Sequence, residues 1–141
     1  MTYRDPSQQL LKAYQNILDG HIIYEGETIT VGTRIPRKKT KYVYLYIEAT
    51  NNYSTGDKVL YNITMAMQIV SMQDISEGDE TVVNSILDQV LGIVGDPNSI
   101  MMNDFTALTS TFGDSEHDTE MSESNYIITK KLRMVHFIEQ K

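Results

Sequence analysis

The feature that most constrains the fold is a pair of long stretches in which apolar and polar residues alternate, Lys41–Thr50 and Val59–Ser71. Side chains leave a β-strand on opposite sides in turn, so this alternation predicts two strands with one apolar face each. Their apolar faces hold Val43, Leu45, Ile47 and Ala49 in the first, and Tyr61, Ile63, Met65, Met67 and Ile69 in the second. The connecting segment Asn51–Lys58 is rich in turn-forming residues, which predicts an antiparallel hairpin. A hairpin is marginally stable alone, so other parts of the chain must cover its apolar face.

Two stretches with helical periodicity are the expected cover. Pro6–Leu18 begins after Asp5, a good N-cap, and ends before Gly20. Its apolar stripe consists of Leu10, Leu11, Tyr14, Ile17 and Leu18. Glu80–Val94 has the strongest stripe in the chain, follows a sequence at Ser76 that resembles a capping box, and ends before Gly95. That stripe consists of Val82, Val83, Ile86, Leu87, Val90, Leu91 and Val94.

The remaining patterns predict more strands. Short β-prone runs at Ile22–Tyr24 and Thr28–Val31 flank a turn, and longer ones at Asn103–Phe112 and Tyr126–Ile138 form a second hairpin. Between the longer pair, residues 113–125 are rich in carboxylates and are expected to form an extended, solvated acidic loop. The element order predicts an α+β fold over residues 1–141, a single domain. Its antiparallel or mixed sheet carries two helices packed on one face.

Composition and spacing point away from catalysis. The chain of 141 residues has no cysteine, so it has neither disulfides nor thiolate sites, and it fits a reducing compartment. Its three histidines lie in different elements, and no nucleotide-binding or nucleophile motif is present. His136 falls on the apolar face of the last strand and is expected to be a packed or partly exposed sheet residue, not a metal ligand. The chain is therefore not expected to be an enzyme or to have catalytic, cofactor or metal-binding residues. Neither a signal peptide nor a membrane span is expected.

The charged residues are segregated in two segments. The basic segment runs from Arg34 to Lys41, and the residues predicted to contact other subunits or partners are Arg34, Arg37, Lys38, Lys39, Lys41, Asp114, Glu116, Asp118, Glu120 and Glu123. The acidic segment has three interpretations: a solvated loop, a calcium site, or a contact with a basic surface of a neighbour. Thr119 and Asn125 stand where a calcium loop needs glycine and glutamate.

The basic segment also has two interpretations, nucleic-acid binding or a protein interface. The tyrosines that follow it and a net charge of -7 favour the second. Opposite charges on different parts of one small body suit head-to-tail association into a ring.

The element order resembles that of tail terminator and tail-completion proteins of tailed bacteriophages, and of related neck proteins. The resemblance is carried by the first helix, Arg34-Ile35-Pro36, the strands Tyr42–Ile47 and Tyr61–Ile69, the helix Val82–Val94 and the long last strand. It implies a hexameric or dodecameric ring in the virion neck or tail, assembled in the bacterial cytoplasm.

The same resemblance implies a structural role. DNA would pass through the channel of the ring without specific binding, and the neighbours would be portal, adaptor or tail-tube proteins. No enzymatic activity, cofactor or membrane is implied. The residues leave one alternative open: a small α+β domain that binds a ligand or peptide, or an enzyme whose residues come from loops.

Overall fold

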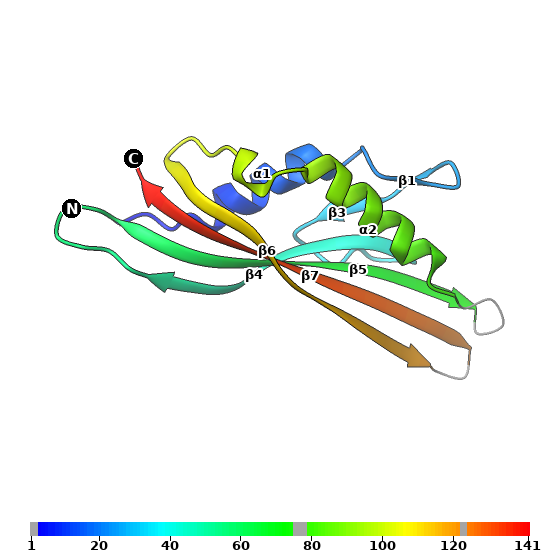
Figure 1. The fold of residues 1–141 in the computed structure, drawn as a ribbon. Coiled ribbons are helices and arrows are strands. Elements are labelled where there is room, and N and C mark those ends of the chain that lie inside the picture. The colour runs from blue at the N-terminus through cyan, green and yellow to red at the C-terminus, as the bar shows by residue number, and fades with distance from the viewer. Residues whose placement is uncertain (1–2, 75–78, 122–123) are drawn as a thin grey trace.

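The computed structural model describes residues 3–74, 79–121 and 124–141, which form one large sheet with two helices against it (Figure 1). The sheet has five strands in the order β3-β4-β5-β7-β6, with bounds Thr30–Gly32, Lys41–Asn52, Leu60–Asp74, Asn125–Gln140 and Phe105–Met121, respectively. All neighbouring strands are antiparallel except β3 and β4, which are parallel. In Figure 1, α1 (Ser7–Leu18) and α2 (Thr81–Val94) lie on the same side of this sheet. The predicted α+β class, with a mixed sheet and two helices on one face, is confirmed.

The segment before β4 differs in detail from the prediction. The run Thr28–Val31 is divided between β2 (Glu27–Thr28), which pairs with β1 (Ile23–Tyr24), and β3 in the main sheet. The turn between β1 and β2 places Glu25 and Gly26 at positive φ, 49° and 78°, as a tight hairpin turn requires. The first part of the run thus belongs to a small hairpin, and the last part forms the edge strand of the large sheet.

Helix α1 has the predicted buried stripe. Leu10, Leu11, Tyr14 and Leu18 are buried, and Ile17 packs against them partly buried. The helix starts one residue later than predicted because Pro6 occupies the N-cap position, while the Asp5 carboxylate accepts a hydrogen bond from the Ser7 N–H at 2.9 Å. Gly20, at φ 83°, turns the chain after the helix.

Helix α2 covers the sheet with a narrower face than its sequence predicts. Val82, Val83, Ile86, Val90 and Val94 are buried, Leu87 is partly buried, and Leu91 is 36% exposed. The expectation that Leu91 packs on the sheet is therefore wrong, because Leu87 and Leu91 lie on the flank of the stripe. The helix start is held by Asp79, whose carboxylate accepts from the Thr81 N–H at 2.8 Å. Ser76, the other part of the predicted capping box, lies outside the described residues.

A β-bulge changes the predicted faces of β4. Ile47 pairs with Met65, whereas Ala49 pairs with Thr64, so the register shifts by one residue between them. Because Met65 and Thr64 lie on opposite faces of β5, Ala49 moves from the helix-covered face to the open face. Ala49 is exposed there, which corrects its assignment to the apolar side.

The largest correction concerns the acidic segment. Strand β6 continues through it to Met121, so the expected acidic loop at residues 113–125 is mostly strand. The register pairs Glu116 with Lys131 and Asp118 with Thr129. Repulsion between like charges made a loop the local expectation. In the folded chain Ser115–Met121 pair residue by residue with β7, and Arg133 of β7 binds the Glu116 carboxylate. The described residues leave out 122 and 123, so the predicted Glu123 has no assigned position.

A buried polar chain joins four elements beneath the helices. His136 of β7 is fully buried, as predicted, and its Nδ1 and Nε2 lie 2.6 Å from Ser110 Oγ of β6 and 2.6 Å from the Tyr14 hydroxyl of α1. Ser110 in turn is bound by Asn98 in the short helix η1 (Pro97–Ser99). Burial holds the pKa of His136 at about 4, so the ring is neutral near pH 7 and suits a core position.

Candidate functional site

The structure places the two charged segments at opposite edges of the sheet. The basic segment lies at one edge, in the connection from β3 to β4 (residues 33–40) and at Lys41, the first residue of β4, and the acidic residues lie on β6, which is the other edge (Figure 1). Three strands, β4, β5 and β7, stand between β3 and β6. With about 4.8 Å between neighbouring strands, the edge strands are about 19 Å apart. The segments are therefore not brought together within one subunit.

Although they lie at opposite edges, the two segments lie at the same height along the strands. The pairing register defines rows of residues that run straight across the sheet. One row consists of Gly32, Tyr44, Gln68, Lys131 and Glu116, and the next but one of Thr30, Tyr42, Val70, Thr129 and Asp118. The basic segment begins directly after Gly32. Its start is therefore level with Glu116 on the far edge.

The basic segment presents cations without carboxylate partners. Arg34, Arg37, Lys38 and Lys39 are exposed, and within the described part of the chain none of them forms an ion pair. Lys38 adopts a positive φ of 59° in the turn. Lys41 differs from the others, because it lies in β4 and its Nζ is 4.0 Å from Glu27 of β2. The predicted basic residues thus form an exposed group of cations at the β3 edge.

The acidic residues of β6 fall into two groups. The Glu116 carboxylate accepts from Arg133 Nη1 at 2.7 Å, and this contact lowers the pKa of Glu116. Asp118 and Glu120 are exposed and make no ion pair among the described residues. For Asp114, only its place in β6 is described. The carboxylates of Asp118 and Glu120 are therefore available to a partner at the β6 edge.

The open face of the sheet contains an ion cluster that sequence reasoning missed. Glu48 accepts from Lys131 Nζ at 2.6 Å and from Arg133 Nε at 2.7 Å, and these bonds lower its pKa. Lys131 also lies 5.5 Å from the centre of the Tyr46 ring, which stacks on Tyr44 at 5.1 Å. The sequence held one indication of this cluster: Lys131 and Arg133 are two residues apart in a predicted strand, so their side chains lie on the same face. Their partner Glu48 could not be identified, because it lies at the bulge.

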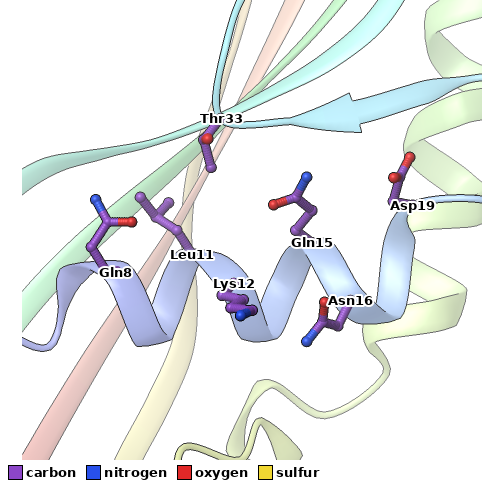
Figure 2. A pocket seen from close by; sticks show the side chains of 7 residues that line it. All are labelled: Gln8, Leu11, Lys12, Gln15, Asn16, Asp19 and Thr33. Atoms are coloured by element: carbon purple, nitrogen blue, oxygen red, sulfur yellow. The ribbon is translucent and has the colours of Figure 1, made fainter.

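The hollows in the surface are shallow. An open groove of about 400 Å³ lies between α1 and the start of the basic segment, and Figure 2 shows the Gln8, Leu11, Gln15 and Asp19 side chains on the side of α1 nearest Thr33. Lys12 and Asn16 line its outer part. A neighbouring groove of about 530 Å³ includes Arg34 and Arg37. The first groove is lined mainly by polar groups, whereas the second is more apolar and includes Val31, Ile35 and Pro36. Neither lining contains a paired nucleophile and base, so we find no arrangement there that performs a recognisable reaction.

Metal binding and membrane crossing find no structural support in residues 3–74, 79–121 and 124–141. No group of histidine and carboxylate side chains there is arranged to hold a metal ion. Neither of the helices described has the length and apolarity that crossing a bilayer requires.

No protein-family model matches the chain, and no curated protein matches it significantly. The function of the chain is therefore inferred from its own geometry.

Proposed function

We propose that this chain is a structural subunit that associates head-to-tail with copies of itself into a closed ring. One observation carries the proposal: the basic segment follows the row that ends at Glu116, and the row of Lys41 ends at Thr119, so the exposed Asp118 lies between these rows at the opposite edge. Within the described part of the chain, neither Asp118 nor the exposed cations of the basic segment form an ion pair. A contact between unlike surfaces leaves one free surface of each kind at the two ends of the assembly, so association continues until a rotation closes the ring. Complementary charges favour this orientation over the alternatives.

We further propose that the ring belongs to the neck or tail of a tailed bacteriophage. The order of elements resembles tail terminator and tail-completion proteins, and the resemblance implies a hexamer or dodecamer around the DNA channel, in contact with portal, adaptor or tail-tube proteins. A structural role is consistent with the shallow, open grooves, neither of which contains a paired nucleophile and base. The alternative, a ligand- or peptide-binding domain or an enzyme, gains no specific support from these grooves.

The oligomer should depend on salt. Light scattering after size exclusion in about 0.1 M salt should give a closed multiple of the 16.1 kDa subunit, and negative-stain images should show rings. Raising the salt to about 1 M shortens the screening length from about 10 Å to about 3 Å, so the rings should dissociate toward smaller species. A monomer at every salt and protein concentration would contradict the proposed function. Rings of unchanged stability at high salt would instead contradict the electrostatic contact.

A further inference from the structure

The exposed edge of β6 has two halves, and they differ in whether their outward backbone groups are free to bind a partner. In the half nearer Phe105, Asn98 of η1 occupies the edge: its Oδ1 accepts from the Ser110 N–H at 2.7 Å, and its Nδ2 donates to the Ser110 carbonyl at 3.2 Å. The side chain thus satisfies both backbone groups that Ser110 directs away from β7. A partner strand therefore cannot pair with β6 at Ser110.

The half that contains the acidic residues has no such cover among the described residues. Hydrogen bonds at the end of β7 fix its alternation, since the Gln140 N–H donates to Val59 on the β5 side and the Lys141 N–H to Asp104 on the β6 side. The β5–β7 register has no shift, so every second residue of β7 faces β6. By this alternation the residues of β6 whose N–H and C=O groups point away from β7 are Ser115, His117, Thr119 and Met121. Carbonyl acceptors therefore alternate with carboxylates along this edge.

We propose that this half of β6, Ser115–Met121, is the surface on which the basic segment of a second copy docks. The inference rests on the proposed ring and identifies its contact. Lysine and arginine carry several donors each, so the basic segment of the neighbour supplies hydrogen bonds both to the Asp118 and Glu120 carboxylates and to the outward carbonyls. Arg34, Arg37, Lys38 and Lys39 are the donors, because all four are exposed and none of them forms an ion pair with the described residues of its own subunit.

A second copy fits this surface better than an unrelated cation does. The two surfaces lie at the same height at opposite edges, so a rotation about an axis roughly along the strands brings one against the other without a shift. Each exposed pair contributes only about 0–1 kcal/mol, so the contact needs several pairs acting together. The basic segment offers such a set over a short stretch of chain. An apolar side chain accompanies the charges on each surface: Ile35 is 62% exposed and Met121 is 67% exposed.

Two charge-reversed variants test this contact. The loop variant carries Lys38→Glu and Lys39→Glu, and the strand variant carries Asp118→Lys and Glu120→Lys. In the loop variant the two new carboxylates cancel the charge of Arg34 and Arg37, and in the strand variant cations face cations. Each variant alone should therefore stay monomeric at concentrations on the order of tenfold or more above those at which the wild type assembles. In an equimolar mixture, a ring in which the two variants alternate has opposite charges at every contact, because each altered surface meets the other altered surface and each unaltered surface meets the other unaltered one. The mixture should therefore form rings in which the two variants alternate, measurable by light scattering and by native mass spectrometry.

The controls separate this inference from the proposed function. Asp57→Lys at the exposed tip of the β4–β5 hairpin changes charge away from both edges and should assemble normally. The loop variant and the strand variant should both keep the melting temperature of the monomer, because the replaced side chains are exposed and make no ion pair within the described part of their subunit. If the wild type forms rings and each variant alone forms them equally well, this contact is wrong but the proposed ring still holds. The same conclusion applies if the two variants stay monomeric when they are mixed. A monomeric wild type would overturn the ring itself.

Discussion

Replacing Ile86 by alanine should lower the free energy of unfolding by about 2–5 kcal/mol, measured by urea titration monitored by circular dichroism. Ile86 is fully buried at the centre of the stripe that α2 presents to the sheet. Truncation removes buried apolar surface and leaves a cavity that neighbouring side chains fill only in part. The better helix propensity of alanine offsets less than about 1 kcal/mol of this loss.

Leu91 on the same helix provides the matched control. Its side chain is also a four-carbon aliphatic group, but Leu91 is 36% exposed at the flank of the stripe. Leu91→Ala should therefore cost about 1 kcal/mol or less, a surface-like effect. Equal losses for both variants would mean that α2 is rotated relative to the face described, whereas a small loss for Ile86→Ala would make the whole helix peripheral.

Acidification should destabilise the fold through His136. Its folded pKa is about 4 because burial disfavours the charged ring, while the ordinary value is 6.5. A depressed histidine pKa means that the unfolded state binds the proton more tightly, so stability is complete above about pH 6.5 and declines as the pH falls toward 4. The loss over this window is about 3 kcal/mol. Tyr14 and Ser110, which contact the ring, provide no charge to offset it, because burial raises the pKa of Tyr14 and keeps it neutral.

The measurement is the slope of unfolding free energy against pH between pH 6.5 and 4.5, compared with that of His136→Gln. The variant should be less stable near pH 7, since it disturbs the contacts with Tyr14 and Ser110, but its slope should be flatter by about one bound proton. His21 and His117 are present in both proteins, so their contributions cancel. A variant with the wild-type slope would show that His136 does not titrate in this range.

The parts of the fold that follow local periodicity could be predicted from the sequence. The stripe of α1 and the alternation of β4 and β5 are properties of neighbouring residues, so they indicate helix and strand without knowledge of the partners. The bulge at Glu48 and the parallel pairing of β3 with β4 depend on the opposite strand. Acidic residues in β6 follow the same logic, because residues 113–121 read as a loop until β7 is placed beside them.

The candidate site was predictable in composition and unpredictable in arrangement. Sequence alone located the cations of the basic segment and the carboxylates near Asp118, since charge segregation is visible along the chain. That they occupy opposite edges at equal height depends on the strand order and on the registers of every pair between them. Glu116, predicted as a partner contact, is held instead by Arg133 of its own subunit.

Because the acidic residues belong to a strand, their spacing is fixed, and this has a consequence for association between identical edges. A two-fold dimer formed through β6 with its axis near Thr119, in the open half of the edge, would place Asp118 of one copy against Glu120 of the other, and the strand fixes their positions. Long unpaired edges otherwise invite such pairing and aggregation. The carboxylates therefore disfavour a two-fold dimer through two β6 edges, because of charge repulsion, and leave the edge available to a cationic surface of another kind.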